Sequence, residues 1–184
     1  MSTGSLDRII SVLGKGDAVE AAPVHLWNPP FCGDIDIEIR RDSSWWHEGS
    51  AIKRLRMAKL FASILLLEGG DYFLVTPAEK VRIRVEDLPF FFSRLRREGR
   101  GSQGKLFLET TLGQEVLVDQ EHPLDFGHQA EPHPTLRVRG NLLGLVSRSV
   151  FYELVELAEL VQTEKGEALG VWSSGSFFEL GEAE

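Results

Sequence analysis

Three short runs in which apolar and charged residues alternate constrain the fold of this chain more than any other feature. Ile35, Ile37 and Ile39 alternate with acidic residues in "DIDIEIR", and "VRIRVED" and "TLRVRG" repeat the pattern with arginines. This two-residue period is that of a half-buried strand. Because the turn-forming residues 42–44 follow the first run, we expect residues 45–48 to return as the second strand of a hairpin.

Two longer segments have the period of an amphipathic helix. They are residues 49–66, "GSAIKRLRMAKLFASILL", and residues 147–161, "SRSVFYELVELAELV". A shorter helix is predicted at residues 5–14. The apolar faces of the two long helices are predicted to carry Leu55, Ala58, Phe61, Ala62 and Leu65 in the first, and Val150, Leu154, Leu157, Ala158 and Val161 in the second.

Both halves of the chain therefore run in the order strands, helix, two strands, which indicates a duplication. The predicted class is α+β, with two related small domains. A lead-in occupies residues 1–25, the N-terminal domain residues 26–95, and the C-terminal domain residues 106–184. The polar, glycine-rich residues 96–105 are predicted to be the linker between the two domains.

Composition excludes several classes of protein. The net charge is −8, and it is uneven, because residues 1–105 hold 16 basic and 14 acidic residues while residues 106–184 hold 4 and 14. Such an acidic chain disfavours duplex DNA as a partner. The apolar run Leu60–Leu67 is too short to cross a bilayer, and the N-terminus lacks the pattern of a signal peptide. With Cys32 as the single cysteine, no internal disulfide forms, and a cytoplasmic location is expected.

One stretch imitates a nucleotide-binding loop. In "EGRGSQGKLF", residues 98–107, Gly99, Gly104 and Lys105 match the spacing G-x-x-x-x-G-K. A true loop of this kind opens a helix and places Ser or Thr after the lysine to hold Mg²⁺. Here Leu106 follows the lysine, and the next residues have the character of a strand. We therefore reject this stretch as a phosphate site.

A better anion site is predicted at the start of the first long helix. Ser50 is expected to cap that helix, which would place Lys53 and Arg54 in its first two turns. Cations are unfavourable at the positive end of a helix, so a bound anion would explain them, with Trp46 available to stack on a planar ring. The alternative is that both cations pair with Glu48 or with acids of the second half. Ser147 and Arg148 repeat the arrangement at the second helix, and both helix starts are hypothesised to face the junction of the halves.

The other groups of polar residues give weaker evidence for a functional site. His122, His128 and His133 match no zinc-ligand spacing, so no metal site is predicted. Cys32 beside Phe31 is expected to be a small buried apolar residue. No motif for a catalytic nucleophile is found, and no catalytic residue is predicted.

Several separated motifs resemble the bacterial family catalogued as domain of unknown function 1285. They are "FCGDIDIEI", "WWHEGSAIKR", "FLVTPAEKVRIRVED" and "RSVFYELVELAEL", and the resemblance runs from Trp27 to Leu180. It implies two α+β domains with a duplicated core, the second superficially like pleckstrin-homology folds. It also implies a ligand site at the domain interface for a nucleotide-like molecule, and a role in signalling. By this likeness the ligand-binding residues are Trp46, His47, Glu48, Gly49, Ser50, Arg54, Thr76, Glu79 and Lys80, with Pro77 in the second motif; Ala51 replaces the proline usual after the motif serine.

The main hypothesis from the sequence is a cytoplasmic, ligand-binding regulatory protein. An anionic, nucleotide-like small molecule would sit between the halves, with Lys53, Arg54 and Lys80 supplying charge. The alternative is a protein-interaction adaptor that uses a sheet edge or the acidic stripe Glu153, Glu156 and Glu159. The hypothesis that the protein is an enzyme is the least favoured of the three. No DNA partner and no membrane insertion are expected.

Overall fold

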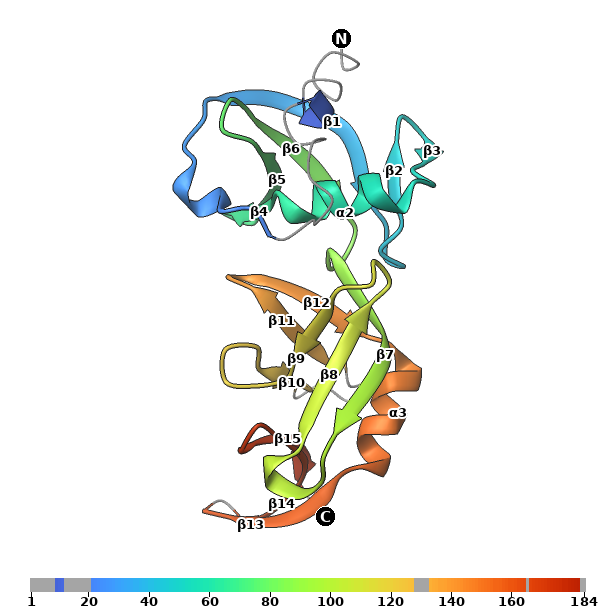
Figure 1. The fold of residues 1–184 in the computed structure, drawn as a ribbon, viewed down its shortest axis with the longest axis vertical. Helices are drawn as coiled ribbons and strands as arrows, with labels where there is room; N and C mark the ends of the chain where they lie inside the picture. Colours follow the sequence, from blue (N-terminus) through green and yellow to red (C-terminus); the bar gives the residue numbers. More distant parts are fainter. Residues whose placement is uncertain (1–8, 12–20, 128–132, 165, 183–184) are drawn as a thin grey trace. The chain divides into compact units, whose positions relative to one another are not determined.

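Each half of the chain builds a sheet of its own, and the two compact units divide between Asp87 and Leu88. The computed structural model describes residues 9–11, 21–127, 133–164 and 166–182 (Figure 1). Of the helix predicted at residues 5–14, only residues 9–11 are described, and they are helical. Among the described residues, no helix has the length and apolarity needed to span a membrane.

The first unit contains a six-stranded sheet, and α2 comes between its third and fourth strands in the chain. After the short 3-10 helix η1 (Val24–Leu26), two three-stranded meanders are joined by α2, and their strands lie in the order β3-β2-β1-β6-β5-β4, with β1 parallel to β6. The elements are β1 (Phe31–Ile39), β2 (Trp45–His47), β3 (Ser50–Ala51), α2 (Leu55–Ser63), β4 (Leu65–Glu68), β5 (Asp71–Val75) and β6 (Lys80–Val85).

The alternation in the sequence divides this sheet into two faces, as predicted. Ile35, Ile37 and Ile39 are each at most 4% exposed, whereas the charged residues between them face outward. On the inner face, Trp45 of β2 packs against Phe61 of α2, with ring centroids 5.9 Å apart. The core of the first unit is therefore the space between the inner face of the sheet and α2.

The second unit contains a larger set of strands. A six-stranded sheet in the order β10-β11-β12-β7-β8-β9 is followed by α3 and a three-stranded sheet in the order β13-β14-β15. The elements are β7 (Phe90–Glu98), η2 (Gly101–Gln103), β8 (Lys105–Thr110), β9 (Glu115–Leu117), β10 (Leu124–Asp125), β11 (Thr135–Arg139), β12 (Leu142–Val146), α3 (Arg148–Glu156), β13 (Glu159–Thr163), β14 (Gly166–Ser173) and β15 (Ser176–Glu182).

The two six-stranded sheets have the same topology. In each, two meanders of three strands meet through their first and sixth strands, β1 with β6 and β7 with β12, and both pairs are parallel. The α+β class and the duplicated core are thus confirmed. The predicted repeat of strands, helix, two strands is not the repeat observed, because α2 lies between the meanders of the first unit while α3 follows both meanders of the second. A helix after the strands also fits the superficial pleckstrin-homology likeness.

Three segments differ from the sequence-based expectation. Residues 96–105, expected as a linker, form the end of β7 and the turn to β8 inside the second unit. That turn leads into the strand β8 and not into a helix. A phosphate-binding loop would open a helix, so this agrees with the prediction that the stretch is not such a loop. Both long helices are shorter than predicted, since Leu65–Glu68 and Glu159–Thr163 are strands. Leu157, Ala158 and Val161 consequently lie outside α3, and Leu65 lies outside α2.

One buried hydroxyl links the two sheets of the second unit. Ser173 of β14 is fully buried, donates a hydrogen bond to the carbonyl of Val118 over 2.6 Å, and accepts one from the backbone N–H of Leu106 over 3.0 Å. Ser147 caps α3 as predicted, because its Oγ accepts a hydrogen bond from the N–H of Val150. The core of this unit includes Phe90, Phe92, Leu108, Leu136, Val150, Leu154 and Val171.

Candidate functional site

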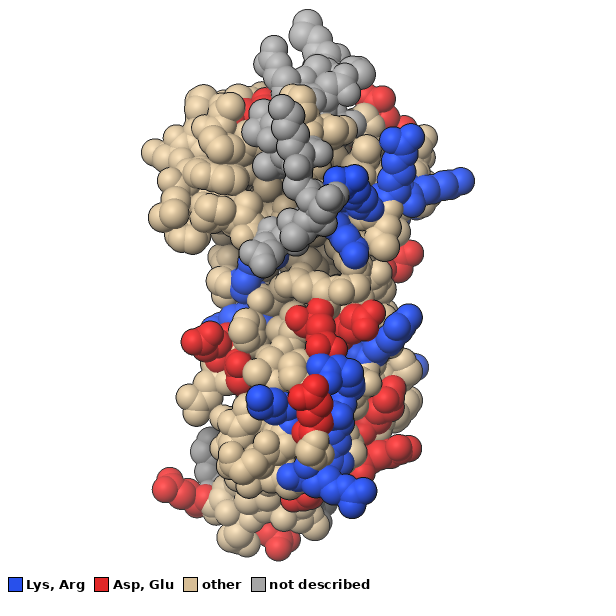
Figure 2. All heavy atoms as spheres, viewed as in Figure 1, with Lys and Arg blue, Asp and Glu red and all other residues tan. Residues whose placement is uncertain are grey.

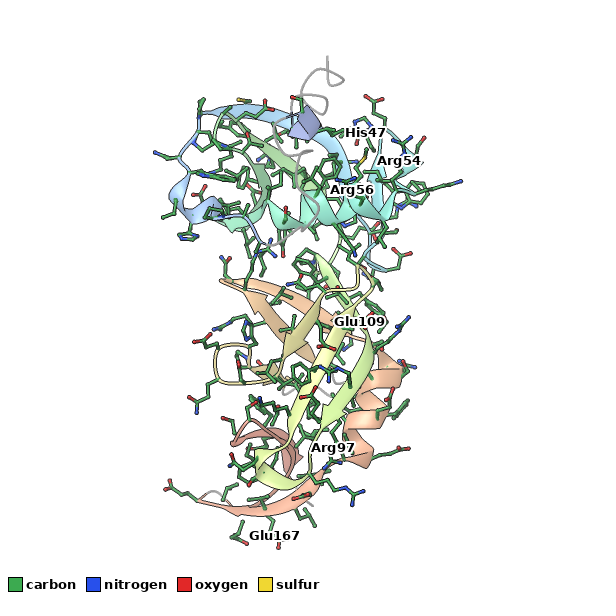
Figure 3. The ribbon with its side chains drawn as sticks, viewed as in Figure 1. His47, Arg54, Arg56, Arg97, Glu109 and Glu167 are labelled. Carbon is green, nitrogen blue, oxygen red and sulfur yellow. The ribbon has the colours of Figure 1, made fainter. Side chains whose placement is uncertain are left out.

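Four cations with no acid among them gather where α2 begins. Lys53, Arg54, Arg56 and Lys59 lie between Glu48 and Glu68, and residues 49–67 contain no Asp or Glu. We call residues 53–59 the cationic segment. In Figure 3, His47, Arg54 and Arg56 lie at the end of the unit where β2, β3 and the start of α2 meet, and Figure 2 shows a gathering of basic side chains there.

The helix start differs from the prediction. Ser50 does not cap α2, because Ser50 and Ala51 form β3 and pair with His47 and Trp46 of β2. The N–H of Ile52 then donates to the carbonyl of Trp45 over 2.8 Å, which keeps the backbone extended. Helical geometry begins only at Leu55, with Arg54 as a cap that makes no side-chain cap bond. Lys53 therefore precedes the helix, and the first N–H groups of α2 have no capping side chain.

The motif "HEGS" forms the two-residue turn of the β2–β3 hairpin. Glu48 and Gly49 both have positive φ, 46° and 73°, between the paired residues His47 and Ser50. Two successive left-handed residues define a type I′ turn, which suits the twist of a hairpin. Gly49 is thus needed by the backbone, and Glu48 holds a conformation that residues with a Cβ adopt at a cost.

We expect Gly49→Val to destabilise the first unit by about 2 kcal/mol, because a β-branched residue is strained at positive φ. Gly49→Asn is the matched variant, since asparagine tolerates this conformation, and it is expected to lose much less. Chemical denaturation measures both. Equal losses for the two variants would mean that φ at this position does not limit stability.

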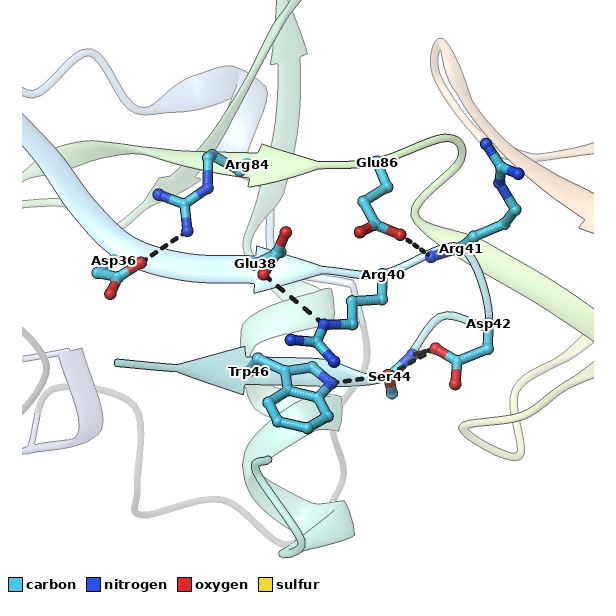
Figure 4. A network of polar contacts seen from close by, with 9 residues as sticks. All are labelled: Asp36, Glu38, Arg40, Arg41, Asp42, Ser44, Trp46, Arg84 and Glu86. Carbon is cyan, nitrogen blue, oxygen red and sulfur yellow. Dashed lines mark hydrogen bonds and ion pairs between the residues drawn. The ribbon is translucent and has the colours of Figure 1, made fainter. Parts of the chain in front are cut away.

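Residues of β2 point to opposite faces of the sheet, and this separates two predicted site residues. His47 lies opposite Ile37 and shares its inner face, while Trp46 lies opposite Glu38 on the outer face. There Trp46 is already occupied, because the guanidinium of Arg40 stacks 3.5 Å from its ring centroid and its indole N–H donates to Ser44 over 2.9 Å (Figure 4). On the inner face, Nε2 of His47 and Nε1 of Trp45 are enclosed without a hydrogen-bond partner among the described residues.

The second predicted motif, "VTPAEK", is also a turn. The Oγ1 of buried Thr76 accepts hydrogen bonds from the N–H groups of Ala78 and Glu79, and this closes the connection from β5 to β6. Lys80 forms an ion pair with Glu68 and lies 4.5 Å above the ring of Phe73. Its charge is therefore matched within the sheet.

The structure does not bring the two predicted groups of site residues together. Lys80 lies opposite Phe31 at the start of β1, whereas His47 lies opposite Ile37, six residues further along the same strand. β1 shifts its register between Phe31 and Asp34, and the two groups pair with different parts of this strand. Thr76, Glu79 and Lys80 thus belong to one end of the sheet, and His47 to Arg54 belong to the other.

The outer face of the sheet carries cations that are all paired. Arg82 makes two hydrogen bonds to Asp34, at 2.9 and 3.0 Å, and Arg84 bonds Asp36 at 2.8 Å. The hydrogen bond from Arg82 lowers the pKa of the Asp34 carboxyl, and the Asp34 bond raises the pKa of Arg82. Arg40 completes the series through Glu38 at 3.7 Å. Solvent exposure makes each of these ion pairs weak, but together they leave the face without unbalanced positive charge.

The same face holds an open depression of about 580 Å³. Its charged lining is more acidic than basic, which disfavours an anion there. The charged residues are Asp34, Glu38, Asp71, Arg82, Arg84 and Glu86.

The cationic segment is different. Within the described part of the chain, Lys53, Arg54 and Lys59 take part in no ion pair, and Lys53 and Arg54 are exposed. The alternative that Lys53 and Arg54 pair with Glu48 is therefore not what the structure has. Arg56 and Lys59 were not among the predicted site residues. The signal that could have found them is the run of residues 49–67 without a single carboxylate.

The histidines of residues 122–133 and Cys32 do not form a second site among the described residues. His122 bonds the carboxylate of Asp119 through Nδ1 at 3.0 Å, and His128 lies outside the described residues. No three His, Cys, Asp or Glu side chains in the described ranges are placed to share a metal ion. Cys32 is exposed, contrary to the expectation that it is buried, because it lies at the start of β1, where both Phe31 and Cys32 face solvent.

Two family models together cover the two units. The model "Domain of unknown function (DUF1285), N-terminal domain" matches residues 22–88, and "Protein of unknown function (DUF1285), C-terminal domain" matches residues 89–180. No curated protein matches the chain.

Two solved structures are similar. A DUF1285 family protein from Silicibacter pomeroyi DSS-3 is 39% identical, covers 94% of this chain and 93% of its own, and has a TM-score of 0.82. A DUF1285 family protein from Shewanella baltica OS155 is 30% identical over 65% of this chain and 90% of its own, with a TM-score of 0.53.

Proposed function

The chain belongs to the DUF1285 family, and we propose that it is a regulatory protein that binds an anionic, phosphate-bearing small molecule of the nucleotide class. The site is the cationic segment of the first unit. The single cysteine and the absence of an internal disulfide fit a cytoplasmic location for this function.

One observation carries this proposal. The cations of the outer sheet face are matched by carboxylates, whereas Lys53, Arg54 and Lys59 have no ion pair among the residues that the structure describes. Like charges placed close together repel one another. A polyanion would relieve that repulsion at the cationic segment, since residues 49–67 contain no Asp or Glu.

The local geometry suits a phosphate group. Arg54 is exposed and offers a fork of donors that matches two phosphate oxygens. The first N–H groups of α2 lack a side-chain cap and lie beside it. No acidic residue lies in the first turn to compete with the ligand. Trp46 has no part in this site, because it stacks on Arg40 at the outer face.

The test is a thermal-shift series with ATP, ADP, pyrophosphate and inorganic phosphate at constant ionic strength. A ligand at about 100 times its Kd stabilises the folded state by about 2.7 kcal/mol, which for a unit of this size is on the order of 10 °C. The double variant Lys53→Gln/Arg54→Gln is expected to lose most of this shift. A larger effect of ADP than of pyrophosphate would identify a contribution from the base.

The matched control is Arg97→Gln/Arg100→Gln, which removes the same charge from exposed arginines of the second unit. Its shift should equal that of the wild type. If none of the four anions stabilises the protein, or if both double variants lose the shift equally, specific phosphate binding at the cationic segment is wrong.

A further inference from the structure

β13 is an edge strand, and β14 is its one strand neighbour in the described structure. It pairs with β14 over five residues, Glu159 to Thr163, and the register runs without a bulge. Figure 1 shows β13 at the margin of its sheet, whereas β15, at the other margin, has β10 beside it. In an antiparallel pair, alternate residues of the edge strand direct their N–H and C=O groups away from the partner.

Glu159 is the one charged residue of β13, and this edge otherwise lacks the features that usually protect one. Proteins blunt free edges with charged side chains, above all lysine, and with proline, bulges or very short strands. The sequence of β13, "ELVQT", contains neither lysine nor proline. Its Leu160 is 62% exposed. A regular, uncovered edge with an exposed leucine is suited to pairing with another chain.

The exposed apolar side chains of the second unit gather next to this strand in the chain. Tyr152 and Val155 on α3 and Leu160 on β13 are 60%, 39% and 62% exposed. All large apolar residues of the second unit that are exposed in the described structure thus fall within nine consecutive positions, 152–160. Leu160 thus offers an exposed apolar side chain on the edge strand itself.

Charge decides which partner fits. Residues 149–184 contain eight glutamates and one lysine. Glu153, Glu156 and Glu159 are exposed among the apolar residues just named, and Glu167 lies on β14 opposite Gln162. A second copy of this chain, pairing through its own β13, would bring these carboxylates face to face, and like charges across an interface are costly.

We propose that the free edge of β13 receives a basic, extended segment of a partner protein as an added strand. Backbone hydrogen bonds to β13 supply the affinity. Leu160 contacts an apolar side chain of the segment, and Glu156 and Glu159 pair with its cations. This interaction does not depend on the proposed anion site, which belongs to the other unit.

The probe is an eight-residue, fluorescently labelled peptide in which lysine and valine alternate. We expect its fluorescence anisotropy to rise on binding to the full chain, and the amide NMR shifts of residues 159–163 to change most. A glutamate–valine peptide of the same length should bind at least tenfold more weakly. The lysine–valine peptide with every backbone nitrogen methylated should also bind at least tenfold more weakly, because it forms no ladder.

Charge reversal localises the contact. Glu156→Lys/Glu159→Lys should weaken binding of the lysine–valine peptide at least tenfold. Glu121→Lys/Glu179→Lys, which changes two glutamates that are also exposed and lie in the same unit, should leave binding within twofold. Equal binding of the methylated peptide would show simple charge attraction and overturn the proposal. An equal loss of peptide binding in the two double variants would also overturn the proposal. So would amide NMR shifts of the wild-type protein that change elsewhere than at β13, and this measurement needs no variant.

Discussion

Replacing Gly170 with alanine is expected to destabilise the second unit by about 3 kcal/mol, because overpacking against a rigid backbone cannot relax. A Cβ at this position would lie 2.4 Å from the carbonyl oxygen of Phe178 and 2.5 Å from Cζ of Phe177. The oxygen belongs to the neighbouring strand β15, so it moves only if β14 and β15 separate. Denaturation measures the loss, and hydrogen exchange should show it in residues 166–182.

Gly181→Ala is the matched control. Gly181 lies on β15, opposite Leu169 of β14, and a Cβ added there meets no atom within 4 Å. We expect this variant to change stability by less than about 0.5 kcal/mol, as is usual for a substitution that meets no packed neighbour. If the two alanine variants are equally stable, the close packing of β14 against β15 is not as described.

Phe61→Ala is expected to have the largest effect in the first unit, about 3–5 kcal/mol, since it removes a buried aromatic side chain and leaves a cavity. Phe61 is fully buried and is the residue through which α2 contacts Trp45 on the sheet. Hydrogen exchange should accelerate in β1, β2 and α2. Differential scanning calorimetry gives the overall loss.

Leu55→Ala, on the same helix, is the control for this prediction. Leu55 is 51% exposed, so its truncation should cost less than about 1 kcal/mol. A loss for Phe61→Ala no larger than that for Leu55→Ala would mean that α2 does not cover the inner face of the sheet.

Strands with one buried face and one exposed face could be predicted from the sequence. β1, β6 and β11 each alternate between apolar and charged residues, because one face is buried and the other meets water. β7 was not predicted as a strand, and in its most charged part, residues 94–98, four of the five side chains are exposed. A run of exposed polar residues has the composition of a loop, and only the pairing with β8 makes it a strand.

Helix ends were predicted less well because tertiary pairing overrides local periodicity. Residues 50–52 fit the helical pattern, but their backbone groups pair with β2. Residues 65–68 continue the apolar run of α2, yet they pair with β5 as the edge strand β4. An apolar run of this kind suits a buried helix or a strand, and periodicity alone does not distinguish them.

The site could be predicted in part. Lys53 and Arg54 were identified by their charge, and the structure leaves them unpaired among the described residues. Trp46 was assigned a stacking role on a ligand, but in the structure its ring stacks on Arg40 on the outer face of the sheet. Lys80 was grouped with them, although it pairs with the start of β1 while His47 lies opposite Ile37, further along the same strand. Such separations depend on strand pairing, which a single sequence does not state.

Isothermal titration calorimetry with pyrophosphate tests the central claim most directly. We expect saturable binding to the wild type with one site per chain, binding at least tenfold weaker to Lys53→Gln/Arg54→Gln, and unchanged binding to Arg97→Gln/Arg100→Gln. Binding that is absent from the wild type, or that is as strong in Lys53→Gln/Arg54→Gln as in the wild type, would contradict the assignment of the cationic segment as a phosphate site.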